Sequence, residues 1–165
     1  MSKQAVFWIR DDFRIKNNPA LSYATNNHEC VSAIYIYNNS KFDQKREAQK
    51  WWISKSLTEF GKDLQKYNIN LEIFNSDEIN FFSKIKKEKD LSVYWNKIYE
   101  PEELDIDKKI ISFFEKEKIN FKFFKGNVLN EFNKVNKNDG TPFKVYSPFW
   151  RNAERVYLEK VPEKN

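Results

Sequence analysis

The chain has 165 residues, of which 40% are hydrophobic and 17% aromatic, so it can build the core of one domain and is not disordered by composition. No apolar run approaches the roughly 20 residues that span a bilayer, and the N-terminal apolar run is too short for a secretory signal, so no membrane partner is expected. The net charge of +5 comes from lysines interspersed with acidic residues, which favours solvated helix faces over a nucleic-acid-binding surface. A single cysteine, Cys30, excludes an internal disulfide and favours a cytoplasmic location.

Short apolar runs alternate with amphipathic stretches along the chain. The apolar runs predict strands at residues 5–10, 31–38, 71–75, 91–96 and 121–124. The amphipathic stretches predict helices that start at Asn18-Pro19, cover 44–67, cover 77–88, start at Pro101 and start after Pro148.

This alternation predicts an α/β fold. We expect a Rossmann-like, doubly wound, five-stranded parallel sheet with strand order 3-2-1-4-5 and helices on both faces. Ligands of such folds bind beyond the carboxyl ends of the strands, so functional residues are expected in the loops after the first, second and fourth strands. One domain is expected over residues 1–160, with a polar tail at 161–165 that begins a linker or marks a truncation.

Charged residues follow the first predicted strand. They are Arg10, Asp11, Asp12 and Arg14. Four alternating charges at a strand end can bind a polar ligand, but we favour the interpretation that they form a salt-bridged turn, which fixes the geometry between strand and helix.

Three carboxylates, Glu100, Glu102 and Glu103, follow the fourth predicted strand. Two of them fall in the first turn of a helix, where the helix dipole favours negative charge. A functional interpretation requires a ligand with N–H donors that a carboxylate can accept, such as a pterin or a flavin-like ring.

Several common site types are disfavoured. The three glycines, Gly61, Gly126 and Gly140, form no phosphate-binding loop. His28 is the only histidine; it falls in a polar stretch and is expected at the surface, so a histidine-based catalytic triad or metal site is not available.

Two adjacent tryptophans stand out in the helix predicted over 44–67. Trp52 flanks its apolar stripe, and Trp51 points roughly opposite, because successive helix residues are about 100° apart. One of the two is therefore either a tolerated surface residue or part of an interface.

Three segments together resemble the DNA photolyase/cryptochrome family. Residues 7–14 and 17–21 are similar to the opening motif of the family, and residues 93–96 with 99–101 are similar to its fourth strand and the loop that follows. Residues 140–151 resemble its Gly-Pro-aromatic segment. The three occur in the order found in the family and span almost the whole chain, which makes the combination specific.

The resemblance implies a division of labour between domains. A C-terminal helical domain of the same protein would bind FAD, and its photoexcited reduced flavin would repair a pyrimidine dimer flipped out of DNA. The present chain would be the domain that holds a light-harvesting pigment: methenyltetrahydrofolate, or else a deazaflavin or a flavin. The FAD domain and the DNA cleft lie outside this chain, so DNA would be bound only through the full-length protein.

The resemblance also assigns pigment-binding positions. In folate-type members the carboxylate at Glu100 and the helix-start positions of Glu102 and Glu103 are implicated, with Glu102 replacing an asparagine. In deazaflavin-type members the pocket uses the end of the second strand, here Ile36, Tyr37 and Asn38, and an arginine at the position of Arg46. An acidic residue of that pocket is Ile98 here, so methenyltetrahydrofolate is favoured over deazaflavin or flavin.

The leading hypothesis is the N-terminal light-harvesting domain of a flavin-dependent DNA photolyase, which would not repair DNA alone. A cryptochrome photoreceptor domain is the near alternative. A free-standing nucleotide-binding α/β module is a further alternative, against which the missing glycine-rich loop counts. A basic DNA-binding protein is a third, and it would show steeply salt-dependent binding.

Overall fold

The computed structural model describes residues 4–86, 91–128, 131 and 134–158. The chain forms two compact units, Met1–Gly126 and Asn127–Asn165. The first unit contains the whole sheet, and the second contains the last helix. The polar tail expected at 161–165 lies outside the described residues.

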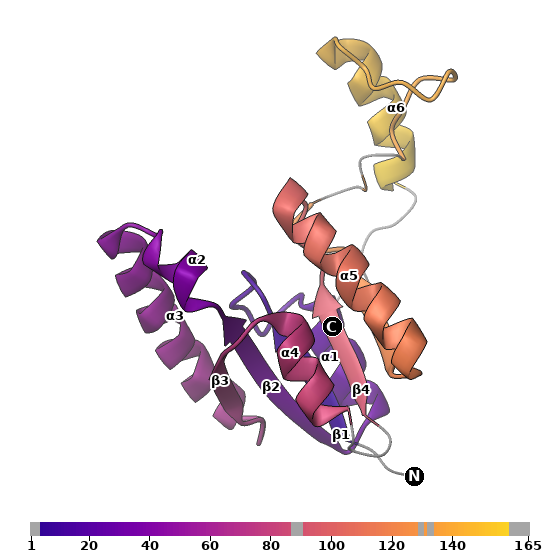
Figure 1. Ribbon diagram of the computed structural model, residues 1–165. Coiled ribbons are helices and arrows are strands. Elements are labelled where there is room, and N and C mark those ends of the chain that lie inside the picture. Colours follow the sequence, from indigo (N-terminus) through magenta and orange to yellow (C-terminus); the bar gives the residue numbers. More distant parts are fainter. Residues whose placement is uncertain (1–3, 87–90, 129–130, 132–133, 159–165) are drawn as a thin grey trace. The chain divides into compact units, whose positions relative to one another are not determined.

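A five-stranded sheet is the centre of the first unit (Figure 1). Its strands are β1 (Gln4–Ile9), β2 (Cys30–Tyr37), β3 (Leu71–Asn75), β4 (Ser92–Asn96) and β5 (Asn120–Phe124). All neighbouring pairs are parallel, and the order is β3-β2-β1-β4-β5. The predicted fold class and strand order are confirmed.

Helices follow each strand except β5 within this unit. They are α1 (Pro19–Asn27), α2 (Asn39–Asp43), α3 (Glu47–Gln65), α4 (Glu78–Ile85) and α5 (Pro101–Glu117). Side-chain caps fix two of these helix starts. The Asn18 Oδ1 atom accepts from the backbone N–H of Leu21 at 3.1 Å, and Asp77 Oδ1 accepts from that of Asn80 at 2.8 Å, which satisfies donors that have no partner inside the helix.

The helices cover both faces of the sheet, as expected. Side chains along a strand alternate between faces, so Phe7 and Ile9 of β1 pack with residues of α1 and α3. Val6 and Trp8 pack instead with residues of α4 and α5. Burial on both faces explains why these strands read as continuous apolar runs in the sequence.

The helix predicted over 44–67 is wrong at both ends. A separate short helix, α2, comes first, and α3 begins only at Glu47. At its end the chain turns through Asn68, which has φ 58°, and the backbone N–H of Ile69 donates to the Leu64 carbonyl at 3.1 Å. Ile69 is therefore the buried residue, and Tyr67, predicted on the apolar stripe, is 61% exposed.

The expectation that Trp52 flanks the apolar stripe of α3 is also wrong. Trp51 and Trp52 are 60% and 65% exposed. The buried stripe is narrow, consisting of Leu57, Phe60 and Leu64. Trp52 precedes Leu57 by five residues, which turns it about 140° away from that residue, so both tryptophans lie outside the stripe.

The second unit contains α6 (Tyr146–Leu158). This helix starts before Pro148, not after it as predicted, because a proline in the first turn removes no intrahelical hydrogen bond. Tyr146 and Trp150 stack with ring centroids 6.2 Å apart and are 69% and 45% exposed. None of the helices formed by the described residues has the length and apolar character needed to cross a membrane.

Two glycines should respond oppositely to alanine. A Cβ at Gly61, inside α3, would lie 3.4 Å from Leu71 Cδ2, an ordinary contact, so Gly61→Ala should stabilise the protein by up to about 1 kcal/mol through helix propensity. A Cβ at Gly126 would overlap the Lys97 carbonyl oxygen, so Gly126→Ala should destabilise it by about 1–3 kcal/mol. Urea unfolding measures both; a stabilising Gly126→Ala would contradict the backbone packing described here.

Candidate functional site

A hollow of about 140 Å³ opens at the carboxyl ends of β1, β2 and β4, and is called here the strand-end pocket. Its charged lining residues are Arg10, Asp11, Lys41, Lys45, Glu78, Glu100 and Glu103. Its other lining residues are Trp8, Ile9, Tyr35, Ile36, Tyr37, Asn38, Phe42 and Ile98. The loops after the first, second and fourth strands therefore meet in one place, as the parallel sheet predicts.

The structure brings together some, but not all, of the predicted pigment residues. Tyr37, Asn38, Glu100 and Glu103 line the strand-end pocket, together with Ile98. Their convergence joins β2 to the segment between β4 and α5. Their suggested roles toward a pigment stay predictions.

Arg46 and Glu102 do not line this pocket. Arg46 is the residue before α3, with an exposed side chain and a backbone N–H that donates to Gln49 Oε1 at 3.0 Å. Its neighbour Lys45 lines the pocket instead. Glu102 is exposed in the first turn of α5, about 100° around the helix from Glu103.

Two lining residues of the strand-end pocket, Arg10 and Glu103, belong to a buried charge cluster. The Arg10 guanidinium, with a side chain 5% exposed, bonds the carboxylates of both Glu103 and Asp107. Those two residues are four apart on α5 and so share one face of it. Trp95 Nε1 donates to Asp107 Oδ1 at 3.1 Å, while the buried Asp107 Oδ2 has no partner within the described residues. Burial raises the pKa of the Asp107 carboxyl, and the Arg10 charge opposes that shift.

A second polar network ties β1 and β4 to the start of α1. Asn96 Nδ2 donates to Asp12 Oδ2 at 3.0 Å and to Asn18 Oδ1 at 2.8 Å, and Asn96 Oδ1 accepts from the backbone N–H of Ala20 at 3.1 Å. Arg14 pairs with Asp12 at 2.9 Å. These contacts support the structural interpretation of the charged turn, except that Arg10 reaches to α5 rather than to its neighbours.

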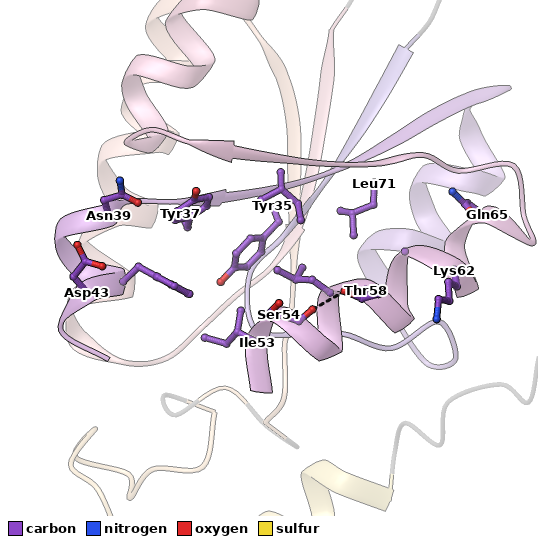
Figure 2. Close-up of a pocket in the computed structure, with 14 residues that line it drawn as sticks. Tyr35, Tyr37, Asn39, Asp43, Ile53, Ser54, Thr58, Lys62, Gln65 and Leu71 are labelled. Carbon is purple, nitrogen blue, oxygen red and sulfur yellow. Dashed lines mark hydrogen bonds between the residues drawn. The ribbon is translucent and has the colours of Figure 1, made fainter. Parts of the chain in front are cut away.

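A larger cavity of about 630 Å³ lies between α3 and the strands β2 and β3, and is called here the α3–β3 cavity (Figure 2). Its lining residues are Tyr35, Tyr37, Asn39, Phe42, Asp43, Ile53, Ser54, Leu57, Thr58, Gly61, Lys62, Gln65, Leu71 and Ile73. Tyr35, Tyr37 and Phe42 line this cavity and the strand-end pocket alike. The two hollows therefore adjoin.

Tyr35 is a site residue that the sequence reasoning missed. It is 7% exposed, and its hydroxyl points into the space between β2 and α3 in Figure 2. Burial, and the nearby charges of Asp11 and Glu103, raise the pKa of Tyr35 to about 12. The signal was available, because Tyr35 and Tyr37 are two residues apart on one strand and so point to the same face.

His28 differs from its expected surface position. It is half-buried at the end of α1, and its Nε2 atom lies 2.7 Å from the Tyr94 hydroxyl. This contact is on an α1-to-β4 packing surface, away from the strand-end pocket. The residues that the structure describes contain no group of three or more His, Cys, Asp or Glu side chains arranged to hold a metal ion.

Comparison with known proteins finds photolyases and cryptochromes. Residues 5–165 match the family described as DNA photolyase. The deoxyribodipyrimidine photo-lyase of Agrobacterium fabrum is 29% identical over 150 residues, which cover 90% of this chain and 31% of that protein. Cryptochrome-2 of Arabidopsis thaliana is 25% identical over 166 residues, which cover 98% of this chain and 27% of that protein.

Solved structures show the same architecture. A class III photolyase from Agrobacterium tumefaciens superimposes with a TM-score of 0.81 at 26% identity, covering 93% of this chain and 32% of that one. An archaeal photolyase from Sulfolobus tokodaii, described as containing two FAD molecules, gives 0.80 at 23% identity, covering 97% and 36%, and supports the fold alone. The chain thus spans between about a quarter and about a third of the length of these relatives.

Removing Arg10 should be far more damaging than removing its neighbour Arg14. Arg10→Ala leaves the carboxylates of Glu103 and Asp107 without their cation, and a broken buried pair costs about 3–5 kcal/mol. Arg14→Ala breaks a pair whose arginine side chain is 44% exposed, which costs at most about 1 kcal/mol. Urea unfolding at neutral pH measures the loss of unfolding free energy in both variants. Equal losses would show that the buried Arg10 pairs stabilise the fold no more than the exposed Arg14 pair does.

Tyr35 should make the protein sensitive to alkali. An unfolded tyrosine ionises near pH 10, whereas folded Tyr35 ionises at about 12, so the folded state holds the proton more tightly. The free energy of unfolding should therefore fall between pH about 10 and 12, by at most about 2–3 kcal/mol from this residue. Tyr35→Phe should reduce the fall, and Tyr67→Phe, at an exposed position, should not; an identical pH profile for both variants contradicts the assignment.

Proposed function

The chain belongs to the DNA photolyase family, and we propose that it is the N-terminal light-harvesting domain of a flavin-dependent DNA photolyase. In this proposal the domain binds an antenna pigment and passes its excitation to an FAD held by a C-terminal helical domain of the same protein. Repair of pyrimidine dimers in DNA would be the activity of the full-length enzyme, a lyase of the reducing cytoplasm.

The strand-end pocket is the observation that carries this proposal. It gathers Tyr37, at the end of β2, and Asn38, which follows it, with Glu100 and Glu103 from the far side of β1. A pterin presents several N–H donors along one edge of its ring, and carboxylates accept such donors in strong, charge-assisted hydrogen bonds. Glu103 is already engaged by Arg10, so Glu100 is the carboxylate we assign to the pigment.

Methenyltetrahydrofolate fits this pocket better than a deazaflavin. Ile98 lines the pocket at the position where deazaflavin-type members have an acidic residue. Arg46, the arginine of that type of site, has its side chain outside the pocket. Both differences remove polar contacts from a deazaflavin, and neither removes the carboxylate that a pterin would use.

A cryptochrome photoreceptor is the second candidate for the parent protein. Two plant cryptochromes are 25% and 22% identical to nearly the whole chain, close to the 29% of the photo-lyase. A repair assay on the full-length protein separates the two: light-dependent reversal of dimers in DNA supports the photolyase, and its absence with FAD bound supports the cryptochrome.

Pigment binding should depend on Glu100 and not on Glu102. The chain is titrated with methenyltetrahydrofolate, with a deazaflavin and with FAD, while pigment absorbance and quenching of tryptophan emission are followed. Trp8 lines the pocket, so quenching reports occupancy. Glu100→Gln should weaken methenyltetrahydrofolate binding about tenfold or more, because it removes a charged acceptor. Glu102→Gln is the matched control and should change binding less than about twofold.

Three outcomes count against the proposal. Failure of every pigment to bind, also with the flavin domain supplied, removes the antenna role. Stronger binding of the deazaflavin than of methenyltetrahydrofolate overturns the choice of pigment. Marked thermal stabilisation by ATP, with none by pterins or flavins, would support a nucleotide-binding module instead.

A further inference from the structure

The first half of helix α3 contributes little to the core. Residues 47–56 are all exposed or half-buried, and the first buried side chain of the helix is Leu57. In Figure 1, α3 lies beside β3 at the outer edge of the sheet. Most of the stability of a helix in a protein comes from packing one of its faces, so this half would gain stability from a partner that covers it.

Trp51 and Trp52 belong to this half and are 60% and 65% exposed. Neither indole contacts another aromatic ring within the described part of the chain. A packed tryptophan buries up to about 250 Å², so the two leave on the order of 300 Å² of apolar surface in water. Tryptophans are enriched among the residues that dominate binding energy at protein interfaces, and an exposed apolar patch of this size is often functional. The pair therefore marks a docking surface.

Four residues form the exposed face of this half, called here the tryptophan face: Ala48, Trp51, Trp52 and Lys55. Successive helix residues are about 100° apart, so Ala48 and Lys55 point roughly opposite to Leu57, with one tryptophan on each side of them. Ala48 is small, which allows another helix to approach closely. Lys55 has no partner among the residues that the structure describes. The face thus combines an aromatic centre with a small residue and a cation.

Glu47 supplies an anion beside this face. Its side chain is 89% exposed, and it bonds Lys50 of its own helix at 3.0 Å. When two copies of α3 are paired antiparallel about a two-fold axis between Trp51 and Trp52, the four indoles gather at the axis. The same pairing brings Lys55 within one residue of a position opposite Glu47 of the partner subunit, and symmetry makes this contact twice. The face is therefore complementary to itself.

We propose that the tryptophan face is a homodimer interface, in which α3 packs antiparallel against α3 of a second copy of the chain. Self-complementarity favours a second copy over an unrelated partner, because an isologous contact uses the same patch on both subunits. The four indoles would bury up to about 600 Å², half of the roughly 1,200 Å² that the smallest specific interfaces bury. The flanking turns of α3 supply the remainder, so the dimer is weak and forms as concentration rises. The inference is independent of any pigment.

The test measures self-association of the full chain by sedimentation velocity and by tryptophan emission over a series of concentrations. The sedimentation coefficient should rise with concentration, and the emission should shift to shorter wavelength as exposed indoles become buried. Trp51→Ala combined with Trp52→Ala should raise the dissociation constant at least about 30-fold, the effect of one interface hot spot. Tyr67→Ala is the matched control, because Tyr67 is a 61% exposed aromatic residue just beyond the end of α3, and it should leave association unchanged.

Charge reversal tests the antiparallel arrangement. Glu47→Lys and Lys55→Glu should each weaken association about fivefold or more, because each places like charges opposite one another twice. A mixture of the two variant chains should form a heterodimer of near wild-type affinity, since opposite charges then meet at both contacts. Lys109→Glu is the matched control. Lys109 is exposed on α5, so its reversal changes the net charge equally but should neither weaken association nor rescue Glu47→Lys.

Four outcomes would overturn the proposal. A monomer at every concentration removes the homodimer. A dimer that survives the loss of both tryptophans has its interface elsewhere on the molecule. A mixture of the two charge variants that stays dissociated excludes the antiparallel pairing. A chain that stays monomeric, but whose emission shifts to shorter wavelength when the flavin domain is added, assigns the tryptophan face to that domain instead.

Discussion

The buried guanidinium of Arg10 is the constraint around which the carboxyl edge of the sheet is organised. A cation with a side chain only 5% exposed must be matched by anions, and both of its partners, Glu103 and Asp107, come from α5. That requirement sets the rotation of α5 about its axis. It also explains why Glu100, just before the helix, stays available at the pocket while Glu103 does not. The Trp95 indole, which donates to Asp107, ties the same cluster to β4.

The fold was predictable because the apolar pattern of the strands and the capping residues of the helices indicate the same order of elements. Strands such as β1 and β4 are buried on both faces, so they appear as unbroken apolar runs, and capping residues such as Asn18 and Asp77 mark where helices begin. The boundary between α2 and α3 was not predictable in this way. Residues 44–46 contain no glycine, proline or capping side chain, so the local preferences there are compatible with one continuous helix, and tertiary packing decides otherwise.

The location of the candidate site could be predicted from the sequence, but the identity of all its lining residues could not. The parallel topology brings the ends of β1, β2 and β4 together, and this places Tyr37, Asn38 and Glu100 in one pocket. Whether Arg46 or Lys45 faces the pocket depends on where α3 begins, which the local sequence leaves open. The choice between Glu102 and Glu103 depends on which of them Arg10 holds. The four-residue spacing of Glu103 and Asp107 was the one sequence signal that pointed to that answer.

The position of β2 in the sheet has a consequence for any absorbing molecule bound beside it. Tyr35 and Tyr37 lie on a strand that is hydrogen-bonded to β1 on one side and to β3 on the other, so the backbone that carries them cannot shift without disturbing the sheet. A ring held against them would keep its transition dipole at a constant angle to the strands. The transfer of excitation energy depends on that angle as well as on distance. An interior strand would therefore hold a pigment in a more constant orientation than a loop would.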